Sequence, residues 1–149
     1  MAESSSHRLN TQLESAGAEH LVLGTMMIEG IPSFKAYANA KGYDLIAVNP
    51  DANLSCRIQV KSRWQTKPDG FPIRNFETDF VVIALLNRGS KNGKVRATPP
   101  SIYVVPVDVI AALPRTTDWG KISFSKFKDM EQYLDRWDLV RLFLRLDGE

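Results

Sequence analysis

The sequence predicts a single α/β domain in which helices flank a mixed β-sheet. Its 149 residues are the usual length of one domain. The stretch DFVVIALL (79–86) is a continuous apolar run rich in β-branched residues, which is typical of a strand buried on both faces and therefore covered by helices on both sides. A stripe of apolar residues at helical spacing precedes the predicted strands, and a second such stripe ends the chain.

The first element after the polar residues 1–8, which we expect to be disordered, is a helix. The domain would thus span residues 9–149. Its apolar stripe recurs at steps of four and three: Leu9, Leu13, Ala16, His20, Leu23 and Met27. We expect His20 to be a core histidine, and Gly17 and Gly24 to allow close packing against a sheet. The helix should end before EGIP, with Gly30 as its C-terminal signal.

Three strands should follow this helix. The stretch IPSFKAYANAKG (31–42) fits either a strand or a short helix, and we favour a strand through Tyr37. The stretches YDLIAV (43–48) and CRIQVKSR (56–63) predict a hairpin around the turn-rich NPDANLS (49–55). The following KPDGFPIRNFE (67–77) has the turn chemistry of a loop.

The rest of the chain alternates strands with short helical segments. After the strand at 79–86, RGSKNGK (88–94) predicts an exposed turn, SIYVVP (101–106) a strand closed by its proline, and VDVIAAL (107–113) a short helix. A C-terminal amphipathic helix should start near Lys126, with Trp119, Tyr133 and Trp137 packing it onto the sheet or onto a second subunit. Its stripe contains Phe127, Met130, Leu134, Trp137, Val140 or Arg141, and Leu144.

The hairpin brings three polar residues to one face of the sheet. With its loop centred near Ala52, Asp44 lies opposite residues 59–61, so Asp44, Gln59 and Lys61 share a face. The opposite face is apolar: Leu45, Ala47, Ile58 and Val60. A carboxylate and an amide oxygen suit Mg²⁺, which prefers oxygen ligands and keeps several waters. A lysine beside the ion would orient or deprotonate water and stabilise developing charge.

The stretches YDLIAV and RIQVKS, preceded by a helix carrying AGAEHLVLG (16–24), resemble the PD-(D/E)xK nuclease superfamily, here as a QxK variant. This superfamily includes restriction endonucleases, Holliday-junction resolvases and some intron homing endonucleases. The resemblance runs from about Glu14 to Val105 and implies a restriction-endonuclease-like αβββαβ core, to which the C-terminal helix is added. No clear helix is predicted between the strand at 56–63 and the later strands, where the family has one.

The resemblance also implies site residues. The metal-binding aspartate of the family falls on Asp44, the (D/E)xK motif on Gln59, Val60 and Lys61, and the helical glutamate on Glu19. Asp44 would bind Mg²⁺ or Mn²⁺ directly, together with the backbone carbonyl of Val60. Glu19 would act through water or a second ion, Gln59 as a neutral ligand or water-positioning group, and Lys61 as the catalytic lysine.

Two features of the sequence depart from the family pattern. The second acid of the motif is replaced by Gln59, which removes a negative charge and should weaken Mg²⁺ binding. Some homing endonucleases of the superfamily have glutamine there, so the change is compatible with activity. The literal Pro-Asp pair, Pro50-Asp51, lies in the predicted turn, too far along the chain to oppose Gln59.

The resemblance therefore implies a Mg²⁺-dependent endonuclease that hydrolyses DNA phosphodiester bonds as a homodimer. The alternative is a catalytically inactive nuclease-fold module that binds nucleic acid or a protein partner, which the glutamine keeps open. A purely structural α/β protein would leave the basic part of the chain unused.

Basic residues are concentrated between Arg57 and Arg96, where nine Lys/Arg accompany three Asp/Glu. Such a block is typical of a surface that binds nucleic-acid phosphates, or of an ordinary solvated surface. Next to the motif strand, Ser62, Arg63 and Lys67 could contact phosphate. Trp64 could stack on a base, although packing in the core is the competing interpretation.

The remaining observations concern the cell compartment. The single cysteine, Cys56, cannot form an internal disulfide, which favours a reducing, cytoplasmic setting. The chain opens without a signal sequence, and its longest apolar run is too short to cross a bilayer. Two histidines and one cysteine do not form a zinc-binding pattern.

Overall fold

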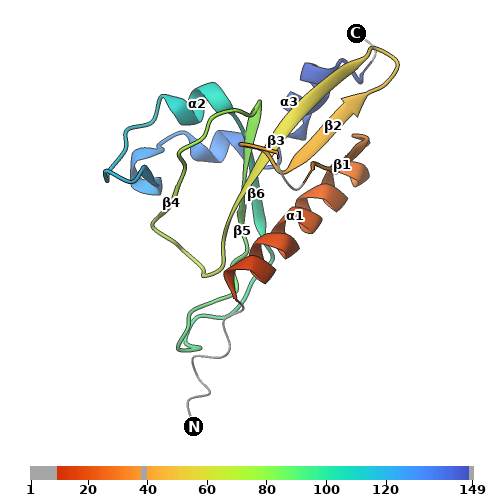
Figure 1. Cartoon of the computed structure of the whole chain (residues 1–149). Coiled ribbons are helices and arrows are strands. Elements are labelled where there is room, and N and C mark those ends of the chain that lie inside the picture. The colour runs from red at the N-terminus through yellow and green to blue at the C-terminus, as the bar shows by residue number, and fades with distance from the viewer. Residues whose placement is uncertain (1–9, 38–39, 148–149) are drawn as a thin grey trace.

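Five strands form the central sheet of the computed structural model, which describes residues 10–37 and 40–147 (Figure 1). Their order is β1-β2-β3-β5-β6. The strands are β1 (Ser33–Lys35), β2 (Leu45–Asn49), β3 (Leu54–Arg63), β5 (Phe80–Leu85) and β6 (Ser101–Pro106). Only the β3–β5 pairing is parallel. The predicted α/β class with a mixed sheet is therefore confirmed, while the predicted disorder of residues 1–8 lies outside the described residues.

Helices and loops cover both faces of this sheet, so it has two separate apolar cores (Figure 1). Helix α1 (Thr11–Ile28) and helix α3 (Trp137–Leu144) pack on one face, against Ile58, Val82 and Val104. Helix α2 (Val107–Ala111) and a small ribbon of β4 (Gly70–Pro72) and β7 (Lys121–Ser123) cover the other. As predicted from its apolar run, β5 is buried on both faces, with Val81 and Val82 both fully buried.

Helix α1 buries a different face from the predicted one. Asn10 caps it, accepting a hydrogen bond from Leu13 N at 2.7 Å. The buried residues are Glu14, Ala18, Val22 and Met26. Leu13 and Met27 of the predicted stripe are instead 57% and 53% exposed. Apolar residues occur on several sides of this helix, so its sequence contains two possible apolar stripes. Packing against the sheet decides which of the two is buried.

Three further predictions about α1 are wrong for the same reason. His20 is exposed rather than in the core, with Nδ1 2.8 Å from Ala16 O. A Cβ added at Gly17 or Gly24 would meet nothing within 4 Å, so neither glycine serves a close approach to the sheet. Both glycines lie on the side of the helix turned away from the core.

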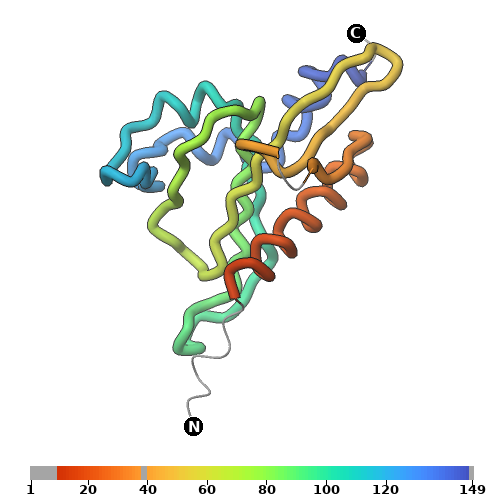
Figure 2. The backbone as a smooth tube through the Cα atoms, viewed as in Figure 1, coloured from red at the N-terminus to blue at the C-terminus, as the bar shows by residue number. Residues whose placement is uncertain are grey.

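The connection from β3 to β5 contains no helix, in contrast to the core that the family resemblance implies. Residues 64–79 instead run as extended chain away from the sheet and back, forming β4 on the way (Figure 2). Pro68, Gly70 and Pro72 lie in this segment and disfavour a helix. Strand β4 pairs with β7, and neither strand was predicted, since each has only three residues.

The C-terminal helix is present but shorter than predicted. Two 3₁₀ turns, η2 (Phe124–Lys126) and η3 (Met130–Tyr133), precede it. Leu134 then forms an isolated β-bridge with Tyr103, and Asp135 has a φ of 53°, so the chain cannot continue as one helix. Trp137 is buried under α3 as expected, whereas Trp119 lies away from this helix and is 47% exposed.

The β2–β3 hairpin has the predicted register. Leu45 pairs with Ile58, and Asn49 pairs with Leu54. Asn49 also donates from Nδ2 to Leu144 O at 2.7 Å, which ties the hairpin to the end of α3. Within the described part of the chain, no helix combines the length and the apolar character that crossing a bilayer requires.

The ribbon depends on Gly70, and this can be tested by stability. A Cβ at Gly70 would overlap the backbone carbonyl oxygen of Ile122 in β7. Moving that backbone away would disturb the pairing of β4 with β7. We expect Gly70→Ala to lower the free energy of unfolding by about 1–3 kcal/mol. Gly17→Ala is the matched control and should raise it by about 1 kcal/mol, because its Cβ enters open space on a helix. Urea unfolding of both variants measures this, and equal midpoints would contradict the described ribbon.

Candidate functional site

The regular pairing of the β2–β3 hairpin ends at Asp44, one residue before β2 begins. Asp44 N still donates to Ile58 O at 2.8 Å, but Asp44 O turns away and accepts from Ala36 N at 3.0 Å. Val60 N, the next donor on β3, bonds to the Asp44 carboxylate oxygen Oδ2 at 2.8 Å. A side chain thus takes the place of a backbone carbonyl at this end of the hairpin.

The backbone of Val60 faces Asp44. The N–H and C=O of one strand residue point toward the same side, so the Val60 carbonyl is directed to the side on which Asp44 lies. The Val60 side chain packs against the core beneath α1. Asp44 and Val60 therefore offer a carboxylate and a carbonyl oxygen from adjacent positions.

Glu19 approaches Asp44 from helix α1. Burial raises the pKa of the Glu19 carboxyl, and the negative charge of Asp44 raises it further. Lys35 opposes this, with Nζ 3.6 Å from Glu19 Oε1. The Glu19 side chain is 21% exposed. Two acids from separate elements are thus held near each other, which raises the energy of their doubly charged state and favours a bound cation.

Lys61 approaches the same carboxylate from β3. Burial lowers the pKa of the Lys61 ammonium, and the Asp44 charge partly offsets this. No carboxylate of the described residues lies within ion-pair distance of Lys61. The structure therefore brings Glu19, Asp44 and Lys61 together around Asp44, while their catalytic and metal-binding roles remain predictions.

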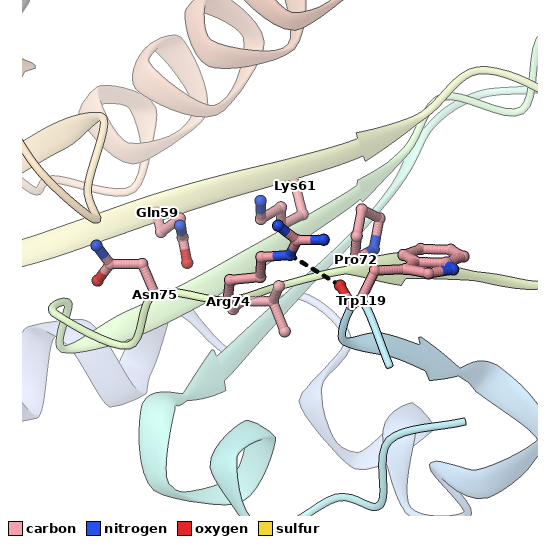
Figure 3. Close-up of a pocket in the computed structure, with 7 residues that line it drawn as sticks. Gln59, Lys61, Pro72, Arg74, Asn75 and Trp119 are labelled. Atoms are coloured by element: carbon pink, nitrogen blue, oxygen red, sulfur yellow. Dashed lines mark hydrogen bonds between the residues drawn. The ribbon is translucent and has the colours of Figure 1, made fainter. Parts of the chain in front are cut away.

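Gln59 occupies the position opposite Asp44 and is only 8% exposed. Its Oε1 atom is buried without a hydrogen-bond partner, which is rare in folded proteins. Gln59 and Lys61 line a cavity of about 470 Å³ (Figure 3). The other lining residues are Pro72, Ile73, Arg74, Asn75 and Trp119. An unsatisfied oxygen at the wall of a cavity indicates a site for a cation, a water or a donor group.

The donors available to a metal ion are all oxygens. Within the described residues, no group of three or more His, Cys, Asp or Glu side chains could hold an ion. A hard divalent cation such as Mg²⁺ would depend on Asp44, Glu19, Gln59 Oε1 and the Val60 carbonyl, completed by water. The set fits a weakly held Mg²⁺ or Mn²⁺ and does not fit a soft ion that prefers sulfur or nitrogen.

The predicted phosphate-contacting residues do not all lie on this face. Ser62 points to α1, where its Oγ lies 3.3 Å from Glu14 Oε2. Trp64 lines a separate cavity of about 190 Å³ with Leu13, Ala18 and other residues. Arg63 continues the face of Gln59 and Lys61 and has a buried Nε atom without a partner. Lys67 is exposed in the loop before β4.

Sequence reasoning missed the second wall of the cavity. Arg74 and Asn75 were placed in a loop, and Trp119 was expected to pack beneath the C-terminal helix. They reach the cavity through the β4–β7 ribbon. Asn75 is also close to the segment before β2, because a Cβ at Gly42 would meet the Asn75 side chain. No local sequence pattern predicts a pairing between two three-residue strands that lie about fifty residues apart.

Comparisons with known proteins show the fold. Scans of family models and of curated proteins found no match. Among solved structures, the chain is similar to a bacterial homing endonuclease, I-Ssp6803I, with a TM-score of 0.60 and 21% identical residues. The alignment covers 88% of this chain and 92% of that one. The arrangement of helices and strands is therefore one that a nuclease also has.

The clustering around Asp44 predicts coupled titrations. Asp44→Asn removes one negative charge, which should lower the pKa of Glu19 and also that of Lys61, since Asp44 raises both. Carbon-detected NMR titration of the Glu19 carboxyl and of the Lys61 side chain measures the two values. Asp138→Asn, on the exposed surface of α3, is the matched control and should move neither.

The raised pKa of Glu19 also fixes the sign of a pH effect on stability. Folded Glu19 retains its proton to higher pH than unfolded Glu19, so it contributes a loss of stability as pH rises from the ordinary value of 4.5 through the folded pKa. Asp44→Asn should shrink this loss. A pKa of Glu19 that is the same in the parent and in Asp44→Asn would show that the two residues are not neighbours.

Proposed function

We propose that the protein is an endonuclease that hydrolyses DNA phosphodiester bonds with a divalent metal ion, Mg²⁺ or Mn²⁺. The observation that carries the proposal is the hydrogen bond that Val60 N donates to the Asp44 carboxylate, whose charge also acts on Glu19 and on Lys61. The likeness to a homing endonuclease supports it at the level of the fold.

Asp44 would hold the ion directly, beside the Val60 carbonyl. Glu19 would bind it through water or hold a second ion, and Gln59 would supply a neutral oxygen or place a water. When bound, the ion supplies Lewis acidity toward the phosphoryl group and acidifies a coordinated water. Because the hydrogen bond from Val60 N fixes Asp44 Oδ2, the carboxylate is oriented before any ion arrives.

Lys61 would take part in the proton transfer. Its lowered pKa brings the amine closer to the pH at which a base is useful. The neutral amine accepts a proton at Nζ from the attacking water as the new P–O bond forms. The bond to the leaving oxygen breaks, and that alkoxide takes a proton from solvent water. Metal binding would neutralise Asp44 and so lower the pKa of Lys61 further, since the Asp44 charge is what raises it.

DNA and a second copy of the chain complete the proposal. The basic block from Arg57 to Arg96 supplies charge for the DNA backbone, with Arg63 next to the site. A duplex has two strands, and a homodimer would place one site on each. The exposed apolar residues Leu13, Leu21 and Ile28 on the outer side of α1 give such a dimer a surface. A cytoplasmic location fits the buried, unpaired Cys56.

A second candidate function is a non-catalytic module that keeps the nuclease scaffold and binds DNA or a protein. Two observations favour it. The second acid of the motif is Gln59, and Glu19 is partly neutralised by Lys35. Both reduce the negative charge available to a cation. Metal binding by the parent protein, measured by calorimetry with Mg²⁺ and Mn²⁺, separates the two candidates.

Lys61→Ala tests the catalytic role. We expect turnover to fall on the order of 10²–10³, because the group that takes the proton and faces the reacting phosphate is lost. Stability should not fall, since the variant removes a buried ammonium without an ion-pair partner in the described residues. Cleavage of labelled plasmid and urea unfolding measure the two effects. If turnover is unchanged, Lys61 has no catalytic role, and Gln59–Val60–Lys61 is an ordinary solvated face of the strand.

Gln59→Glu tests whether the glutamine has a specific role. The change adds a carboxylate to the oxygen donors, so Mg²⁺ affinity should rise or stay the same. If the parent cleaves DNA and the variant does not, Gln59 places water or metal in a way that a charge disrupts. If the parent is inactive and the variant gains metal binding and nicking, the second candidate function is supported. Gln65→Glu, exposed beyond the end of β3, controls for added charge.

A further inference from the structure

The cavity beside Lys61 has a second wall, built by the β4–β7 ribbon. Arg74 and Asn75 follow β4, and Trp119 precedes β7 (Figure 3). These residues lie across the cavity from Gln59 and Lys61, which project from β3. The roles proposed for Glu19, Asp44, Gln59 and Lys61 assign no function to the residues of this second wall.

Arg74 is held in place by the turn that leads into β7. Its Nε donates to the Trp119 carbonyl oxygen at 3.0 Å. Gly120, with a φ of 89°, allows this turn to lie close, since a Cβ there would stand 2.8 Å from Ile73 O and 3.4 Å from Arg74 Cγ. Within the described residues, the terminal nitrogens Nη1 and Nη2 have no hydrogen-bond partner. One nitrogen fixes the guanidinium, and two remain available to a ligand.

The charge of the cavity points to an anion. Lys61 and Arg74 are its only charged lining residues, and neither has an ion-pair carboxylate among the described residues. Figure 3 shows the Arg74 side chain extending from its own wall toward Lys61. The Arg74 guanidinium, held without a carboxylate partner among the described residues, favours a phosphate.

We propose that this cavity binds one nucleotide of the cleaved DNA strand and that Arg74 holds the phosphate next to the one that is cut. The inference rests on the proposed nuclease function and adds a site to it. Arginine presents two parallel N–H groups that match two phosphate oxygens. A volume of about 470 Å³ suits a ligand of nucleotide size, and Trp119, Pro72 and Ile73 give it an apolar side for the sugar.

Arg74 is a positioning residue in this scheme, because it holds a flanking phosphate and does not touch the reacting atoms. Its contribution is to align the strand, so that the scissile phosphate meets Lys61 in a productive orientation. Loss of Arg74 should therefore weaken binding and raise KM for DNA more than it lowers kcat. A residue that only supported the ribbon would change unfolding without a selective effect on one phosphate.

The first experiment is the salt dependence of duplex DNA binding, measured by fluorescence anisotropy in EDTA. Arg74→Gln should reduce the slope of log K against log salt by about 0.9, the loss of one phosphate contact. Affinity should fall about tenfold or more. Arg74→Lys should keep the slope and recover part of the affinity. Arg145→Gln, which removes the same charge from the exposed end of α3, should leave the slope unchanged.

The second experiment identifies the phosphate. Once the parent's cut on a duplex is mapped, single methylphosphonates replace the phosphates on either side of it. One neutral replacement should weaken the parent about tenfold and leave Arg74→Gln unaffected, since the contact is already gone. Equal sensitivity of both proteins at every position would overturn the Arg74 site while leaving the nuclease proposal intact. A parent that binds no DNA would overturn both.

Discussion

The hydrogen bond from Val60 N to the Asp44 carboxylate sets the geometry of the whole candidate site. Continued in the same register, a regular antiparallel ladder would pair Val60 with Tyr43, and Val60 N would donate to the Tyr43 carbonyl. The Asp44 side chain accepts this bond instead, while the Asp44 carbonyl accepts from Ala36 N, so the regular pairing of the hairpin ends one residue before β2. The orientation of the Asp44 carboxylate beside the Val60 backbone depends on that one substitution of acceptor.

The arrangement of charged groups in the site is electrostatically unfavourable. Two carboxylates share a small region, and an ammonium is buried without a paired acid in the described residues. Each arrangement disfavours the charged form that the group has in water. The two surrounding apolar cores, on either face of the sheet, hold these groups in position. Stored electrostatic strain of this kind is common where a ligand is to be bound.

The sequence revealed features whose signal is local and periodic. The hairpin register followed from alternation in YDLIAV and CRIQVKSR, and the burial of β5 followed from its apolar run. The face of α1 did not follow, because apolar residues at both Leu13 and Val22 allowed two orientations that only the sheet distinguishes. Arg74 and Trp119 were out of reach, since their place depends on a pairing between two distant three-residue strands.

That distant pairing has a consequence for the order of assembly. The β2–β3 hairpin closes over a short loop, whereas β4 meets β7 only after about fifty intervening residues are in place. Contacts between such separated segments form late, because closing a long loop costs entropy before it is rewarded. During synthesis from the N-terminus, the Asp44–Val60 edge exists before Trp119 has been added to the chain. A growing polypeptide therefore contains the Asp44–Val60 edge first and acquires the cavity's second wall only when most of the chain is complete.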